Sequence, residues 1–92
     1  MHERKAVIAS RIGLHARPAG IFAEAVSELA IEVTIALEDE PAEDAMDASS
    51  ILSLMSLGAA NGDTVVLRAE GEGAEQALDA LVRLLETDLD AE

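Results

Sequence analysis

The chain has 92 residues, half of them apolar, and a formal net charge of −13 with only six lysine and arginine residues. This length and apolar content predict a single domain, residues 1–92, with a hydrophobic core of its own. The excess of acids argues against a surface for nucleic acid or anionic lipid, and the single aromatic residue, Phe22, offers no stacking platform for single strands.

The residue types also narrow the cofactor chemistry and the compartment. Cysteine is absent, which excludes a disulfide framework and a cysteine-ligated metal. The apolar runs are shorter than a signal-peptide core or a membrane span. We therefore expect a soluble protein of the cytoplasm, without metal, cofactor or direct membrane insertion.

The first half of the chain predicts a strand, a helix and a second strand. Residues 6–10 predict a short strand, and residues 12–15 a loop. From Pro18, which suits the first turn of a helix, apolar residues recur at a 3.6-residue spacing and predict a helix over about 17–29. Residues 31–37 alternate apolar and polar side chains, with Ala36 on the polar side, and predict a strand with one buried face.

The second half predicts a loop, two helices and a further strand. Residues 38–47 contain six acids and predict a solvated loop, with a short strand over 43–47. A short helix over 50–57 begins at a cap on Ser49 or Ser50 and ends at Gly58. After an Asn61-Gly62 turn, a strand over 64–70 and an amphipathic helix over 74–85 complete the chain.

This order of elements predicts an α/β (α+β) fold of two layers. Strands with one apolar face need one covering layer, and amphipathic helices supply it from one side of the sheet.

One basic segment stands out in the acidic chain. Four of the six bases fall within the first seventeen residues, around the sequence Gly13-Leu14-His15-Ala16-Arg17-Pro18-Ala19. The backbone N–H groups at the start of the helix, at Ala16 and Arg17, would bind an anion, and the Arg17 guanidinium suits phosphate oxygens. An imidazole with a pKa near its ordinary value of about 6.5 is largely neutral at pH 7 and can act as a nucleophile. These residues fit a histidine that carries a phosphoryl group, although a histidine at this position is also typical of a helix cap or a plain surface.

Two motifs then resemble one known family. The sequence GLHARPA resembles the active-site motif of HPr, the histidine-containing phosphocarrier family of the bacterial sugar phosphotransferase system, and residues 50–58, SILSLMSLG, are similar to its second signature. The resemblance covers nearly the whole chain. It implies a four-stranded antiparallel sheet covered on one side by three helices, in the order β-α-β-β-α-β-α.

The resemblance also implies a function for the site. His15 would accept a phosphoryl group from enzyme I, which is charged from phosphoenolpyruvate, and would donate it to the IIA domains of sugar permeases. Arg17 would steady the phosphoryl group. The chain would then be a monomeric carrier that is itself phosphorylated, and not an enzyme that turns over substrate.

The chain departs from the family pattern in three respects. Ile12 stands where the family often has a polar residue. Glu24 and Ser27 lie on a helix that often presents lysines. The stretch between the two motifs is a few residues longer than usual, with the excess in the acidic loop around 38–44.

The short helix raises two further questions. Ser50 matches a position that some relatives phosphorylate for regulation, but we favour a helix cap, partly because Glu43, Asp44 and Asp47 would repel a second dianion. Its apolar residues are too many for one buried stripe. We expect Ile51, Leu54 and Leu57 in the core, and Leu52 and Met55, together with Ile21, in a docking patch for partners.

Two other classes of function remain open from the sequence. The chain could be a regulatory module whose phosphorylation gates docking to a transcription factor or enzyme, including a nitrogen-linked phosphorelay. A small-molecule sensor of the same shape ranks last of the three candidates, because it would need a ligand pocket and nothing in the sequence marks one. The acidic loop 38–47 lacks the spacing of a calcium loop, so we expect a solvated loop there.

Overall fold

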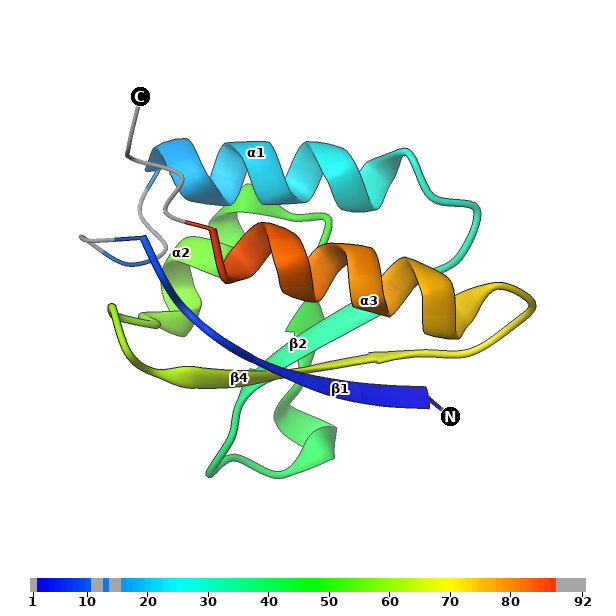
Figure 1. Cartoon of the computed structure of the whole chain (residues 1–92). Coiled ribbons are helices and arrows are strands. Elements are labelled where there is room, and N and C mark those ends of the chain that lie inside the picture. Colours follow the sequence, from blue (N-terminus) through cyan, green and yellow to red (C-terminus); the bar gives the residue numbers. More distant parts are fainter. Residues whose placement is uncertain (1, 11–12, 14–15, 88–92) are drawn as a thin grey trace.

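The computed structural model describes residues 2–10, 13 and 16–87 (Figure 1). Its elements, in chain order, are β1 (His2–Val7), α1 (Ala16–Ser27), β2 (Val33–Leu37), a 3₁₀ turn (Ala42–Asp44), β3 (Met46–Asp47), α2 (Ile51–Leu57), β4 (Thr64–Ala69) and α3 (Ala74–Leu85).

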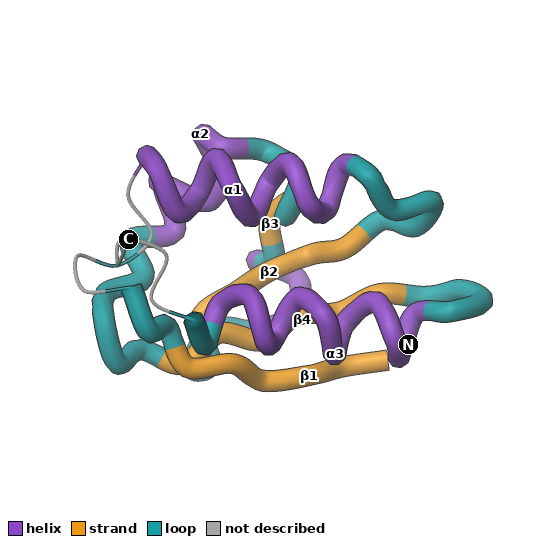
Figure 2. Tube along the Cα trace, turned by 45° about the horizontal axis from the view of Figure 1, so that its top comes forward, coloured by secondary structure: helices purple, strands orange, loops and turns teal. Residues whose placement is uncertain are grey.

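The four strands form one antiparallel sheet in the order β1-β4-β2-β3, and the helices lie together on one side of it (Figures 1 and 2). In both views α1 and α3 run side by side in opposite directions. The predicted open-faced, two-layer sandwich of four strands and three helices is confirmed.

The core lies between the sheet and the helices. Phe22 on α1, Leu54 on α2, and Leu78 and Leu85 on α3 are fully buried against the inward side chains of the strands, among them Ile35 and Leu67. Burying one such side chain stabilises the fold by about 1.5–3 kcal/mol. The helices are therefore held by their apolar stripes, as the 3.6-residue spacing indicated. Within the described part of the chain, no helix is both long and apolar enough to cross a bilayer.

The first strand begins earlier than predicted. We expected residues 6–10, whereas β1 spans His2–Val7 and pairs with β4 from His2↔Ala69 to Val7↔Thr64. Its charged residues fit a strand because they form ion pairs: Arg4 with Asp79, and Lys5 with Glu38. Beyond Val7 the backbone no longer pairs with β4, and the Ile8 N–H donates to the carbonyl of Asp63, which lies in the turn before β4.

The side of the sheet away from the helices is also less wet than predicted. Ala36, expected on the polar face of its strand, is fully buried, and so is its cross-strand neighbour Val66. Because β4 lies between β1 and β2, the Lys5–Glu38 ion pair spans the β4 strand on this face. Long charged side chains shield apolar surface in this way while their heads stay in water.

Two other boundaries differ by a few residues. The second strand starts at Val33 and not at Ile31, which is half-buried at the edge of the core. The short strand expected over 43–47 is a 3₁₀ turn followed by a strand of two residues.

Candidate functional site

The predicted acceptor, His15, lies outside the described residues, together with its neighbours Arg11, Ile12 and Leu14. The structure describes the residues that flank it in the chain. Gly13 precedes it by two positions, and Ala16, the next residue, is the first of α1. The geometry of the site is therefore built from these flanks.

Gly13 is held against the turn that follows α2. Its φ is +87°, a left-handed conformation that favours glycine. A Cβ at this position would lie 2.5 Å from the carbonyl oxygen of Ala59 and 2.9 Å from the Cα of Ala60. Gly13 therefore approaches this turn closely, and its neighbour there is backbone, which cannot move aside cheaply.

The segment before Gly13 is anchored by one side chain. The Asn61 amide nitrogen lies 3.4, 3.1 and 3.3 Å from the carbonyl oxygens of Ile8, Ala9 and Ser10 and donates to all three. The Gly62 N–H donates to the Ile8 carbonyl as well. The sequence indicated only a turn at Asn61, because the acceptors lie about fifty residues away in the chain.

The start of α1 presents the groups expected of an anion site. Ala16 and Arg17 are exposed, whereas Pro18 and Ala19 are buried and fix the first turn against the core. No acidic residue lies in that turn. The first backbone N–H groups of a helix have no partner within the helix and carry positive partial charge, so this end attracts an anion. The described residues contain no cluster of three or more metal-ligating side chains.

Comparison with known proteins identifies the family of this chain. The family model described as "PTS HPr component phosphorylation site" matches residues 2–87. The chain belongs to the HPr family. It is thus a phosphocarrier protein of the phosphotransferase system and not a turnover catalyst.

Relatives and solved structures agree with this placement. Phosphocarrier protein HPr of Streptomyces coelicolor is 41% identical over 85 residues, which cover 92% of this chain and 88% of that protein. Phosphocarrier protein NPr of Shewanella violacea is 36% identical over 88 residues, 96% of this chain and 92% of that protein. The crystal structure of HPr-C-His from Thermoanaerobacter tengcongensis superposes with a TM-score of 0.83 at 37% identity, covering 100% of this chain and 99% of that one.

Two further relatives are similar to the chain over nearly its whole length. HPr-like protein Crh of Halalkalibacterium halodurans is 31% identical over 86 residues, covering 94% of this chain and 98% of that protein. A second crystal structure from Thermoanaerobacter tengcongensis, 38% identical with a TM-score of 0.64 over 94% of each chain, is described as an HPr dimer.

The second HPr signature contains the short helix α2 and its caps. Ser50 is the N-cap, and its hydroxyl accepts a hydrogen bond from the Ser53 N–H at 3.2 Å. Gly58 ends the helix in the left-handed conformation, with a φ of 71°. The capping function that we favoured for Ser50 is confirmed. Ser49, the residue before this cap, donates two hydrogen bonds to the Asp47 carboxylate, one from its hydroxyl and one from its backbone N–H. These bonds, with that of the hydroxyl the larger cause, lower the pKa of the Asp47 carboxyl below its ordinary value.

The residues proposed for docking are exposed on α1 and α2. Leu52 is 79% exposed, Met55 44% and Ile21 37%. Leu54 and Leu57 are buried as predicted, but Ile51 is 45% exposed, so its expected place in the core is wrong. A helix turns by about 100° per residue, and on a helix of two turns the inward stripe through Leu54 and Leu57 leaves Ile51 to one side.

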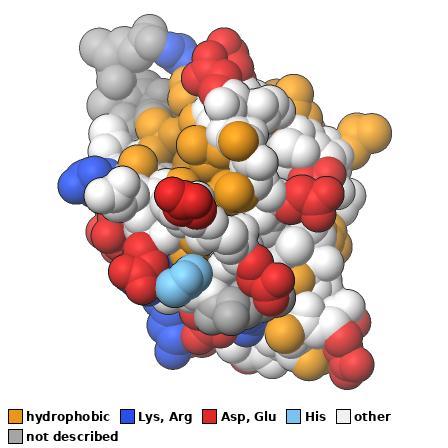
Figure 3. Space-filling view, turned by 90° about the vertical axis from the view of Figure 1, so that its right-hand side faces the viewer, with side chains coloured by type: hydrophobic (Ala, Val, Ile, Leu, Met, Phe, Trp, Pro, Cys, Tyr) orange, Lys and Arg blue, Asp and Glu red, His pale blue; other side chains and the backbone are white. Residues whose placement is uncertain are grey.

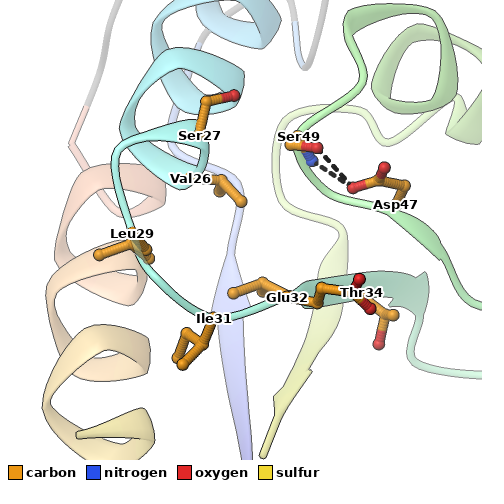
Figure 4. Close-up of a pocket in the computed structure, with 9 residues that line it drawn as sticks. Val26, Ser27, Leu29, Ile31, Glu32, Thr34, Asp47 and Ser49 are labelled. Atoms are coloured by element: carbon orange, nitrogen blue, oxygen red, sulfur yellow. Dashed lines mark hydrogen bonds between the residues drawn. The ribbon is translucent and has the colours of Figure 1, made fainter.

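A hollow of about 460 Å³ lies near the start of α2 (Figure 4). It is enclosed by the end of α1, the start of β2 and the turn that follows β3. The residues that line it are Val26, Ser27, Leu29, Ile31, Glu32, Val33, Thr34, Asp47 and Ser49. The sequence had marked no pocket, because this one joins segments from three separate parts of the chain.

Proposed function

We propose that the chain accepts a phosphoryl group on His15 from enzyme I and donates it to sugar-specific IIA domains. The observation that carries this proposal is the family match over residues 2–87, which includes the GLHARPA motif. Exposed Arg17 in the first turn of α1 supports it, because a guanidinium next to the acceptor can stabilise the charge of a phosphoryl group in transit.

The geometry around the acceptor supports a carrier because of what it holds rigid. Asn61 ties residues 8–10 to the turn after α2, Gly13 packs against the same turn, and Pro18 and Ala19 tie the first turn of α1 to the core. Phosphoryl transfer depends mainly on positioning and on stabilising charge. Anchored flanks reduce the reorganisation that they need when one partner leaves and another arrives.

We also propose that the exposed apolar residues Ile21, Leu52 and Met55 contact both classes of partner. A phosphocarrier must present the same acceptor to a donor and to several recipients in turn. One shared docking patch allows this, and large exposed apolar side chains are typical of such surfaces.

The relay can be tested directly. The chain, enzyme I and phosphoenolpyruvate would be combined with a panel of purified IIA domains from sugar permeases and from the nitrogen-linked pathway. We expect phosphate on at least one sugar IIA domain, and none when His15→Ala replaces the wild-type chain. Transfer only to the nitrogen-linked domain would contradict the sugar pathway and favour the alternative.

That alternative, a regulatory module, has one observation in its favour: relatives named NPr and Crh match nearly the whole chain. In such a module a phosphoryl group on His15 or Ser50 would gate docking to another protein. The Ser50 hydroxyl already caps α2, and this use of the hydroxyl supports the structural function. An acid-stable phosphate on Ser50 after incubation with a cell extract and ATP would favour regulation.

We propose further that the chain works as a monomer in the cytoplasm, where enzyme I would charge it. A single acceptor per molecule needs no second copy. Because one solved relative is described as a dimer, light scattering on the eluted protein is the appropriate measurement, and a dimer at micromolar concentration would contradict the proposal.

A further inference from the structure

The hollow beside α2 has an apolar floor and a polar rim. Val26 lies in the last turn of α1, Leu29 just after that helix, and Val33 at the start of β2. Figure 4 shows that the polar side chains around them come from two sides: Glu32 just before β2 and Thr34 on β2 face Asp47 at the end of β3 and Ser49 in the turn that follows. Its volume of about 460 Å³ lies within the range of about 300–1,000 Å³ typical of ligand pockets.

The polar groups of this hollow are mainly acceptors. The Ser27 hydroxyl donates its proton to the Ala23 carbonyl at 2.9 Å, and the Ser49 hydroxyl donates to Asp47 Oδ1 at 2.7 Å. What these two side chains offer to an occupant is lone pairs, and the carboxylates of Glu32 and Asp47 add only acceptors. An occupant must therefore bring donors, and a cation satisfies two carboxylates best.

Four exposed acids form an acidic rim at this end of the molecule, and we use that term for Glu24, Glu28, Glu32 and Asp47. None of them forms an ion pair with another described residue. By contrast, the described bases of the sheet side are matched by acids: Arg4 with Asp79, Lys5 with Glu38, and Arg68 with Glu3. Figure 3 views the end at which α1 terminates and shows acidic side chains around an area of hydrophobic surface. The rim thus carries a negative charge that none of the bases in the described part of the chain neutralises.

The acidic rim adjoins the surface proposed for docking. At about 100° per residue, Arg17, Ile21 and Glu24 fall on one exposed stripe of α1, and Glu28, whose N–H bonds to the Glu24 carbonyl, continues it just beyond the helix. On the other bank, Asp47 and Ser49 precede exposed Ile51 by four and two residues. A protein partner commonly buries about 800 Å² of each surface. A partner that covers Ile21 and α2 therefore reaches the hollow with the edge of its footprint.

From these observations we propose that enzyme I inserts a lysine or arginine side chain into this hollow, where the stem packs on Val26 and Leu29 and the charged head bonds to Glu32 and Asp47. The aliphatic stem and cationic head of such a side chain match the apolar floor and the acceptor rim. Glu24 and Glu28 face further basic residues of the same partner. The inference rests on the proposed function, since the occupant belongs to the phosphotransfer partner.

The test compares charge-neutral variants with nearly the same shape. Glu28→Gln/Glu32→Gln removes two charges from the acidic rim. Glu40→Gln/Glu43→Gln removes the same charge at the 3₁₀ turn, which Figure 1 shows at the side of the molecule opposite α1. All four residues are exposed, so both variants should fold, and circular dichroism checks this. The rate of His15 phosphorylation by enzyme I from the same genome would be measured at several salt concentrations.

We expect the rim variant to lower the second-order rate constant by about 3-fold or more at low salt, because rim charges act mainly on the association rate. This difference should fade between about 0.1 M and 1 M NaCl, as the screening length shortens from about 10 Å to about 3 Å. The control variant should stay near the wild-type rate. Isotope-labelled wild-type chain mixed with enzyme I should also show NMR shifts at the amides of Glu32 and Ser49.

Three outcomes would overturn the inference. The rim variant could react as fast as the wild type, or faster, which would mean a partner surface that is neutral or acidic there. The two variants could slow equally, which would mean an effect of net charge alone. In the first two outcomes the wild-type chain is still phosphorylated, so the inference fails while the proposed function stands. If the wild-type chain accepts no phosphate from enzyme I, both the proposed function and the inference fail.

Discussion

At the scale of single residues, Gly13 is the position where backbone conformation and packing coincide. Its left-handed φ and its approach to Ala59 each disfavour any side chain. Gly13→Ala should destabilise the fold by about 1–3 kcal/mol, since a Cβ would overpack against backbone and strain φ. Thermal or denaturant unfolding measures this.

Gly20 offers the matched control. It lies within α1, its φ is not positive, and a Cβ there would meet nothing within 4 Å. Gly20→Ala should therefore stabilise the protein by about 0.4–1 kcal/mol, through the unfolded chain and the better helix propensity of alanine. A loss of stability in both variants would show that the difference assigned to the two glycines is wrong.

Arg17 and Leu78 separate function from stability. Arg17 is exposed in the first turn of α1, so Arg17→Ala should leave the midpoint of unfolding nearly unchanged while slowing phosphoryl transfer strongly. Leu78 is fully buried on α3, and Leu78→Ala should cost about 2–5 kcal/mol. Equal thermal destabilisation by the two substitutions would contradict these assignments.

At the scale of elements, the turn after α2 governs the segment before the acceptor. Asn61→Asp keeps the shape of the side chain but removes the N–H groups that reach the carbonyls of residues 8–10. Leaving a buried carbonyl without a donor lowers the free energy of unfolding by about 1–3 kcal/mol. We expect the Gly13 amide to exchange its hydrogen faster in this variant, while the central Leu67 amide of β4 stays protected.

The outcome that would contradict this assignment is specific. Unchanged exchange at Gly13 in Asn61→Asp would mean that the backbone bonds of the turn, such as Gly62 to Ile8, hold the segment without the side chain.

Elements with strong periodicity were predictable from the sequence. The helix over 74–85 was located to the residue, because its buried stripe repeats over three turns. The start of β1 was missed because His2 to Lys5 are charged, and they suit a strand only through partners distant in the chain, such as Glu38 and Asp79. Ile51 was assigned to the core because apolar character alone does not say which side of a two-turn helix faces inward.

The site was predictable in its motif but not in its supports. Gly13 and Arg17 could be singled out because their chemistry is local to the GLHARPA sequence. The Asn61 anchor and the hollow beside α2 depend on residues far apart in the chain, which only the folded topology brings together.

At the scale of the whole molecule, the two ends of α1 present side chains of opposite charge. The N-terminal end follows the acceptor in the chain and presents Arg17, while the C-terminal end presents the acidic rim and the hollow. The sheet and α3 supply the buried core that fixes both ends relative to each other. A partner that docks along α1 and α2 can thus contact the positive side chain at one end and the acidic rim at the other.

The most direct measurement is phosphorus NMR of the chain after incubation with enzyme I and phosphoenolpyruvate. We predict one phosphohistidine signal that disappears on mild acid treatment and is absent from His15→Ala. A signal that survives acid, or one that persists in His15→Ala, would contradict the claim that His15 carries the phosphoryl group.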